Sequence, residues 1–307
     1  MPANQSSTVG FIGLGAMGMG MAKSLVRAGV RVQGFDINPQ AIETFVAAGG
    51  TGANSVAEAA AGADLLTIVV VNAAQAEAVL FGPEGGAEAL SPGGVVMLCS
   101  TVKPDYAKET ARRLYAMGLE MLDAPISGGA AKAALGQLSV MASGHPTAFA
   151  KADPVLAAVA ENVYRLGDEC GLGSTVKMVN QLLAGVHIAA AAEAMALGVK
   201  AGADPEALYE VISNSAGGSW MFQNRVPHML AGDYTPLSAV EIFVKDLGIV
   251  LETGQTERFP LPLAAAAHQM FLMAAAAGYG REDDSAVVKV FEQLAGIDVR
   301  AGAKHGQ

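Results

Sequence analysis

The chain reads VGFIGLGAMG at residues 9–18, a short apolar run that leads directly into Gly13-Leu14-Gly15-Ala16-Met17-Gly18. We expect a buried strand over 9–12 and a helix from Met17 to Ala28. Glycines at this spacing permit a tight turn, close approach of the backbone to a pyrophosphate, and close packing of the helix on the strand. The unpaired N–H groups of the helix N-terminus then bind the phosphate oxygens. All six residues from Gly13 to Gly18 are therefore expected to bind a dinucleotide cofactor.

Asp36 ends the second expected strand, about 20 residues beyond the glycines, where a ribose-binding acid belongs. A carboxylate there accepts hydrogen bonds from the ribose hydroxyls and repels a 2′-phosphate. The residues that follow, Ile37-Asn38-Pro39, include no arginine to pair with a 2′-phosphate. Asp36 therefore predicts NAD rather than NADP; the alternative is a surface aspartate that caps the helix beginning at Pro39.

Short β-branched runs alternate with helical stretches through the first half of the chain, which is typical of a doubly wound parallel sheet, the α/β Rossmann architecture. After Gly167 almost no strand signal remains, and proline and glycine clusters separate a series of helical stretches. We expect an NAD-binding Rossmann domain at 1–168 and an all-helical (all-α) substrate domain at 169–307, which begins with one long helix. The expected strands are 9–12, 30–35, 65–71, 95–99, 119–122, 138–142 and 163–166, and the expected helices are 17–28, 39–48, 73–80, 104–117, 175–201, 205–214, 221–230, 242–253, 262–277 and 285–294.

Charge and hydropathy exclude two classes of partner. The formal net charge is −10, whereas a protein that binds a nucleic-acid backbone needs a basic face. Two apolar stretches, 176–199 and 261–278, are mostly alanine, and the first carries polar side chains, so we expect buried core helices rather than membrane spans. The start of the chain lacks the basic residues and apolar run of a signal peptide, and a cytoplasmic location is expected.

The low content of charged residues points to self-association. Charged residues make up 16% of the chain, against about 25% in an average soluble protein, and burial of surface in an oligomer is one way to cover so apolar a chain. Cys99 and Cys170 are the two cysteines, and neither they nor the five histidines have the spacing of metal ligands. We therefore expect no disulfide framework and no metal site.

Three further motifs carry possible chemistry. DAPISGG at 123–129 follows the fifth expected strand, where ligands bind in doubly wound sheets, and Ser127, Gly128 and Gly129 offer a hydroxyl and N–H groups that suit a carboxylate; a plain turn is the alternative. GLGSTVKMVNQ at 171–181 places Lys177 near the start of the long helix, with Asn180 and Gln181 on the same face. The positive end of the helix dipole disfavours an ammonium there, and this favours a lysine that exchanges protons near neutral pH. An isolated lysine of this kind is otherwise a surface residue, and Lys245-Asp246 alone is typical of a solvated helix face.

Together, in this order and spacing, the four motifs resemble the β-hydroxyacid dehydrogenase family over about residues 8–295. The resemblance implies an oxidoreductase with a Rossmann domain, an interdomain helix and a helical domain used in dimerisation, so that a homodimer or homotetramer is expected. It implies a small hydroxy-acid substrate, Lys177 as the catalytic lysine, and Ser127, Gly128 and Gly129 on the substrate carboxylate. The other residues that it places at the cofactor are Val71, Asn72, Ser100 and Thr101 on the nicotinamide side and Lys245 at the cleft.

One departure from the family pattern bears on the substrate. Many members carry asparagine four residues after the catalytic lysine, where this chain has the longer Gln181. The stretches 180–187 and 213–222 are most similar to the branch that oxidises L-threonate, which implies oxidation at C2 to 2-dehydro-L-erythronate. Asn180 and Gln181, with Asn214, Ser215 and Ser219, could serve as partners for the extra hydroxyls of this acid. The alternatives are the activities of 3-hydroxyisobutyrate dehydrogenase or tartronate semialdehyde reductase and, in another class, a noncatalytic NAD-sensing protein.

Overall fold

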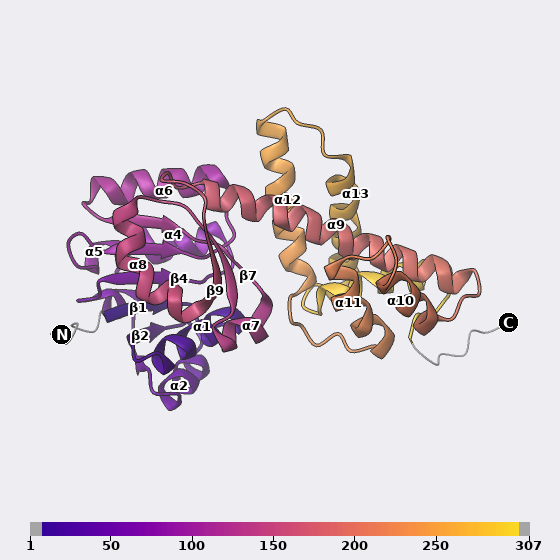
Figure 1. Ribbon diagram of the computed structural model, residues 1–307, viewed down its shortest axis with the longest axis horizontal. Helices are drawn as coiled ribbons and strands as arrows, with labels where there is room; N and C mark the ends of the chain where they lie inside the picture. The colour runs from indigo at the N-terminus through magenta and orange to yellow at the C-terminus, as the bar shows by residue number, and fades with distance from the viewer. Residues whose placement is uncertain (1–7, 301–307) are drawn as a thin grey trace. The chain divides into compact units, whose positions relative to one another are not determined.

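The computed structural model describes residues 8–300, and the chain divides into two compact units after Lys177 (Figure 1). In the first unit, apolar runs form a six-stranded parallel sheet with the strand order β3-β2-β1-β4-β5-β6. The chain moves outward from β1 to β3 and then returns to place β4 beside β1, so the strand order reverses between β1 and β4. The strands are β1 (Thr8–Ile12), β2 (Arg31–Phe35), β3 (Thr51–Gly52), β4 (Leu65–Ile68), β5 (Val95–Leu98) and β6 (Glu120–Asp123).

Helices cover both faces of this sheet, because the strand side chains alternate between two apolar clusters. Val95 and Met97 of β5 point to one cluster, whereas Val96 and Leu98 point to the other. The first cluster includes residues of α1 (Ala16–Arg27), α2 (Pro39–Ala47), α7 (Gly129–Leu135) and α8 (Pro146–Val159). The second includes residues of α3 (Val56–Ala60), α4 (Ala73–Phe81), α5 (Gly86–Ala89) and α6 (Pro104–Ala116).

A second, three-stranded sheet follows in the same unit. It consists of β7 (Ile126–Ser127), β8 (Leu138–Ala142) and β9 (Ala160–Arg165), with β7 antiparallel and β9 parallel to β8. Alternate residues of β8, including Leu138 and Val140, extend the first apolar cluster. This small sheet carries the chain from β6 to the long helix α9 (Leu172–Lys200).

Beyond Lys177, the described part of the chain contains helices and one isolated β-bridge, between Ala239 and Asp283. A single apolar cluster joins them, with Met195, Phe243 and Phe271 among its fully or almost fully buried members. The elements are the rest of α9, then α10 (Pro205–Ser213), α11 (Trp220–Ala231), α12 (Val240–Thr256), α13 (Pro262–Ala274), η1 (Ala275–Tyr279), η2 (Asp284–Val287) and α14 (Val288–Ala295).

These two architectures confirm the fold class expected from the sequence, an α/β Rossmann fold followed by an all-helical region. The domain limits of 1–168 and 169–307 stay a prediction, since a division into compact units is not a test of independently folding domains. One helix, α9, is long and apolar enough to cross a membrane by length and composition alone, and 44% of its most apolar window is buried within the protein. Its buried face belongs to the apolar cluster of the helical unit, as in a core helix.

Candidate active site

The loop between β1 and α1 has the geometry of a dinucleotide cradle. A side chain on Gly18 would place its Cβ 1.9 Å from the carbonyl oxygen of Gly13, and Gly13 itself has φ +96°. A Cβ on Gly15 would meet nothing within 4 Å, so the loop has open space where the backbone can approach a pyrophosphate. The N-cap of α1 is Gly15, and neither a side-chain cap nor an acidic first-turn residue competes for the N–H groups of this described helix. These residues fit the nucleotide that the sequence predicts.

Asp36, which directly follows β2, is hydrogen-bonded to this loop. Its Oδ2 accepts a hydrogen bond from the N–H of Leu14 at 2.6 Å, and its Oδ1 accepts one from the N–H of Asn38 at 2.8 Å. The cap of α2 is Asn38, whose side chain accepts from the N–H of Gln40. Asp36 therefore holds the glycine loop rather than capping α2, and its carboxylate lies beside the loop, as a ribose-binding acid does.

The residues expected on the nicotinamide side follow β4 and β5, whose carboxyl ends share one edge of the sheet with that of β1. The buried hydroxyl oxygen of Ser100 accepts a hydrogen bond from the N–H of Val70 at 3.1 Å, which ties the two loops together. Asn72 caps α4 by accepting from the N–H of Gln75, while Val71 is exposed and Thr101 half-buried. The structure thus brings these loops to the edge where doubly wound sheets bind ligands, and their contact with the cofactor stays a prediction.

Ser127 ends β7, Gly128 is the N-cap of α7 and Gly129 is its first residue, with φ values of +137° and +76° for the two glycines. The left-handed conformation of both residues requires glycine. Ser127 and Gly128 are half-buried and Gly129 is exposed, so a small ligand can reach their polar atoms. Their binding of a substrate carboxylate stays a prediction.

Lys177 lies in the second turn of α9 and is almost completely buried, with 7% of its surface exposed. The surface-lysine alternative is therefore wrong for this residue. Its burial is consistent with a proton-exchanging lysine, while its catalytic role stays a prediction.

In the helical unit, α9 and α12 share a chain of polar contacts. The side-chain Nδ2 of Asn180 donates to Oε1 of Gln181 at 3.0 Å, and Nε2 of Gln181 donates to Oδ2 of Asp246 at 2.6 Å. The ammonium of Lys245 lies 2.5 Å from Oδ1 of the same carboxylate. Asp246 is only 2% exposed, so the solvated-face interpretation of Lys245-Asp246 is wrong, and the amide of Gln181 is held at both ends.

The sequence did not predict Asp246 as a partner of Gln181. Its signal was its position directly after Lys245, but only the fold shows that it faces Gln181, 65 residues away in the chain. The other polar candidates, Asn214, Ser215 and Ser219, make local bonds: the first two donate to backbone carbonyls one turn earlier, and Ser219 caps α11. Among residues 8–300, no group of three or more His, Cys, Asp or Glu side chains could hold a metal ion.

Two family models match the two parts of the chain. Residues 8–167 match the family described as the NAD binding domain of 6-phosphogluconate dehydrogenase. Residues 171–291 match the family described as NAD-binding of NADP-dependent 3-hydroxyisobutyrate dehydrogenase.

Individual relatives match over nearly their whole length. The L-threonate dehydrogenase of Cupriavidus necator is 59% identical to this chain, over 93% of this chain and 96% of the relative. The 3-hydroxyisobutyrate dehydrogenase of Pseudomonas aeruginosa is 35% identical, over 92% and 98%. A crystal structure from Salmonella typhimurium, described as 3-hydroxyisobutyrate dehydrogenase, is 55% identical with a TM-score of 0.88 and covers 92% of this chain and 99% of that one.

Proposed function

Because the chain belongs to the 3-hydroxyisobutyrate dehydrogenase-like family of NAD-dependent hydroxyacid dehydrogenases, we propose that it oxidises L-threonate at C2 to 2-dehydro-L-erythronate. The observation that carries the proposal is the difference in identity between its relatives. Identity is 59% to a relative named for L-threonate and 35% to a relative named for 3-hydroxyisobutyrate. The description of the Salmonella structure, at 55% identity, makes 3-hydroxyisobutyrate the second candidate substrate.

Different residues of the proposed site transfer the proton and hold the substrate. When bound, the nicotinamide supplies the acceptor for the hydride that leaves the substrate carbon. Lys177 takes the hydroxyl proton at its Nζ during oxidation and returns it during reduction; its burial supports this role. Ser127, Gly128 and Gly129 hold the substrate carboxylate. The protein forms no covalent bond to the substrate. Much of the rate acceleration comes from the correct orientation of the substrate toward Lys177 and the nicotinamide.

Two amides on α9 contribute to selection of the sugar acid. Asn180 offers its carbonyl oxygen and its remaining N–H to a substrate hydroxyl, since one of its N–H groups is directed to Gln181. Gln181 contributes by fixing Asn180 and Asp246 in place. A buried site built for hydroxyl groups rejects an analogue that lacks them, because its polar atoms are then left without partners.

Asp36 gives the enzyme a preference for NAD over NADP. Its carboxylate is fixed beside the glycine loop by two backbone N–H groups, and a 2′-phosphate placed there meets a like charge. We also place Lys245 among the residues that bind the cofactor.

The protein assembles as a homodimer or homotetramer and works in the cytoplasm. Large apolar side chains on the helical unit support the assembly, because Leu197, Leu263 and Leu294 are each more than two-thirds exposed. Light scattering at working concentrations tests this directly, and a stable monomer contradicts it.

A substrate panel tests the proposed function. The purified protein is incubated with NAD and, separately, with L-threonate, D-erythronate, D-glycerate or 3-hydroxyisobutyrate, and the formation of reduced cofactor and the mass of the product are followed. The proposal predicts the highest kcat/KM for L-threonate. A higher value for 3-hydroxyisobutyrate or D-glycerate contradicts the substrate and retains the dehydrogenase. Binding of NAD without turnover of any hydroxy acid identifies a noncatalytic NAD-sensing protein.

A further inference from the structure

Asp123, the first residue of the DAPISGG stretch, makes contacts that differ from those proposed for Ser127–Gly129. It ends β6 and is completely buried. Its Oδ1 accepts a hydrogen bond from the hydroxyl of Ser174 at 2.7 Å. Its Oδ2 accepts from the N–H groups of Gly171 and Ser174 at 2.9 and 2.8 Å, and from the hydroxyl of Ser143 at 3.4 Å. A carboxylate from the sheet therefore caps the N-terminus of α9.

The start of α9 is also packed directly against the ends of β6 and β8. The N–H of Gly173 donates to the hydroxyl oxygen of Ser143 at 3.0 Å. A Cβ on Gly173 would lie 2.4 Å from the carbonyl oxygen of Met141 and 2.5 Å from that of Asp123. The backbone of the first turn therefore has little freedom to move, and Lys177 lies less than one turn beyond Ser174.

We propose that Asp123 is a positioning residue for Lys177, because its buried carboxylate fixes the first turn of α9 and places a negative charge at the positive end of the helix that carries the lysine. This inference rests on the proposed catalytic role of Lys177. All four groups around Asp123 donate hydrogen bonds to it, so the ionised carboxylate, which only accepts, matches them. The charge offsets the effect of the helix dipole, which otherwise disfavours an ammonium in the first turns.

The titratable groups that act on Asp123 from neighbouring elements are thiols. Cys99, directly after β5, and Cys170, two residues before the start of α9, are buried, and burial raises the pKa of both thiols, that of Cys170 to about 11. Cys170 in turn lies 3.6 Å from the hydroxyl of Tyr115, whose pKa burial also raises. Glu120, on β6 itself, acts electrostatically on Cys170. The thiols and the phenol are therefore neutral at assay pH. Burial also raises the pKa of Asp123, and the hydrogen bonds that it accepts from Ser174, Gly171 and Ser143 oppose this effect and favour the ionised carboxylate.

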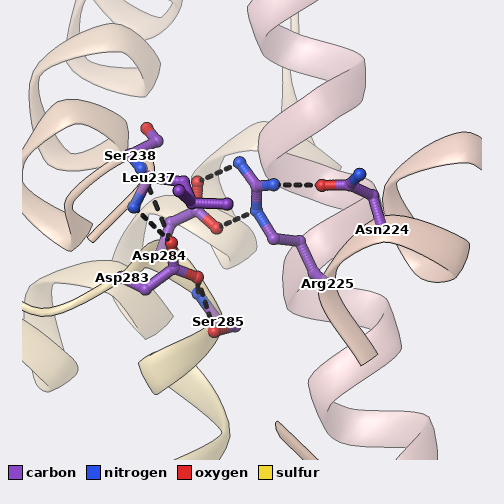
Figure 2. A network of polar contacts seen from close by, with 7 residues as sticks. All are labelled: Asn224, Arg225, Leu237, Ser238, Asp283, Asp284 and Ser285. Atoms are coloured by element: carbon purple, nitrogen blue, oxygen red, sulfur yellow. Dashed lines mark hydrogen bonds and ion pairs between the residues drawn. The ribbon is translucent and has the colours of Figure 1, made fainter. Parts of the chain in front are cut away.

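The test compares Asp123→Asn with Asp283→Asn. The first variant keeps the size of the side chain, removes the charge and turns an amide toward groups that already donate. Asp283 is a matched control: it is also completely buried, it caps η2 by accepting from the N–H and hydroxyl of Ser285 and it accepts from the N–H of Leu237 (Figure 2). No residue of η2 belongs to the proposed site.

For Asp123→Asn we expect kcat to fall by about 10- to 100-fold, the size of the loss of a hydrogen bond to a charged group. The affinity for NAD, measured by fluorescence titration, stays within about twofold, and the pH profile of kcat moves to lower pH because the ammonium has lost a nearby negative charge. We expect Asp123→Asn and Asp283→Asn to lower the melting temperature by comparable amounts. Asp283→Asn is expected to leave kcat and the pH profile of kcat unchanged. Asp123→Asn with the kcat and pH profile of the wild type, or equal losses of kcat in both variants, overturns the proposal.

Two further measurements test the effect of Asp123 on Lys177. Ser174→Ala removes one donor and keeps the charge, so it stands in if Asp123→Asn does not fold; we expect a lower kcat at unchanged KM, and wild-type kcat overturns the proposal. Pulsed acetylation of Lys177 by acetic anhydride, followed by mass spectrometry across a pH series, needs no turnover. It therefore tests the effect of Asp123 on Lys177 even if the proposed oxidation of L-threonate fails, and a labelling profile unchanged by Asp123→Asn contradicts the inference.

Discussion

Shortening Gln181 by one methylene, in Gln181→Asn, tests the polar contacts of the helical unit. Nε2 of Gln181 lies 2.6 Å from Oδ2 of Asp246. Loss of one carbon–carbon bond withdraws the amide by about 1.5 Å, to about 4 Å from the carboxylate, which is too far for a hydrogen bond. The buried carboxylate then retains Lys245 as its remaining partner in this chain of contacts.

The expected loss of stability in Gln181→Asn follows from the charge and the burial of Asp246, the hydrogen-bond partner of Gln181. A hydrogen bond to a charged group contributes about 1.5–3 kcal/mol. Because Asp246 is only 2% exposed, water cannot easily replace the amide. We expect Gln181→Asn to lose about 1.5–3 kcal/mol of unfolding free energy. We also expect kcat/KM for L-threonate to fall at least tenfold, because Asn180 loses the carbonyl that orients its side chain.

Urea unfolding and steady-state kinetics measure the two quantities. Gln223→Asn is the matched control, because it shortens another helical glutamine whose Nε2 donates to the carbonyl of Ser213 at 3.0 Å on the exposed surface of the protein. Its unfolding free energy is expected to stay within about 0.5 kcal/mol of the wild type. The reasoning is refuted if Gln181→Asn, like this control, keeps the unfolding free energy and the kcat/KM for L-threonate of the wild type.

Three other substitutions test separate parts of the account. Lys177→Ala is expected to remove most of kcat while the Kd for NAD is unchanged. A kcat near that of the wild type contradicts the catalytic role of Lys177. Asp36→Ala is expected to narrow the preference for NAD over NADP, and equal kcat/KM for the two cofactors in the unmutated enzyme excludes the role given to Asp36. Burial raises the pKa of Asp284, which is paired with Arg225 (Figure 2), from 3.8 to about 6. The native state then holds this proton in a window where the unfolded chain has lost it, so the unfolding free energy of the wild type, relative to Asp284→Asn, is expected to fall by about 3 kcal/mol from about pH 4 to pH 7. If the unfolding free energy of the wild type relative to Asp284→Asn instead rises from pH 4 to pH 7, the ion pair with Arg225 has a larger effect on the pKa of Asp284 than burial has.

Much of the fold could be predicted from local patterns. The runs expected as strands at 9–12, 30–35, 65–71, 95–99 and 119–122 form β1, β2, β4, β5 and β6, with ends that differ by a few residues. Short elements gave too little periodicity to recognise, as in the two-residue strands β3 and β7 and the five-residue helix α3. The helix α8 was missed as well, and Pro154 lies within it.

The site could be predicted only where its signal is local. The glycine loop and Asp36 form a compact motif with a fixed spacing, and the structure places them together. The buried roles of Asp123 and Asp246 depend on partners 51 and 65 residues away. Each aspartate belongs to a motif that the sequence analysis singled out, but the motif does not indicate which distant residue the carboxylate contacts, so these contacts required the fold.

Internal competition between two substrates tests the central claim most directly. The enzyme is given NAD and equal concentrations of L-threonate and 3-hydroxyisobutyrate in one tube, and the ratio of the two products at low conversion gives the ratio of their kcat/KM values. A site in which Asn180, fixed by Gln181, binds a hydroxyl of a sugar acid is expected to favour L-threonate by roughly 10⁴-fold. A product ratio near one, or an excess of the product from 3-hydroxyisobutyrate, contradicts the proposal that this enzyme is built to oxidise L-threonate.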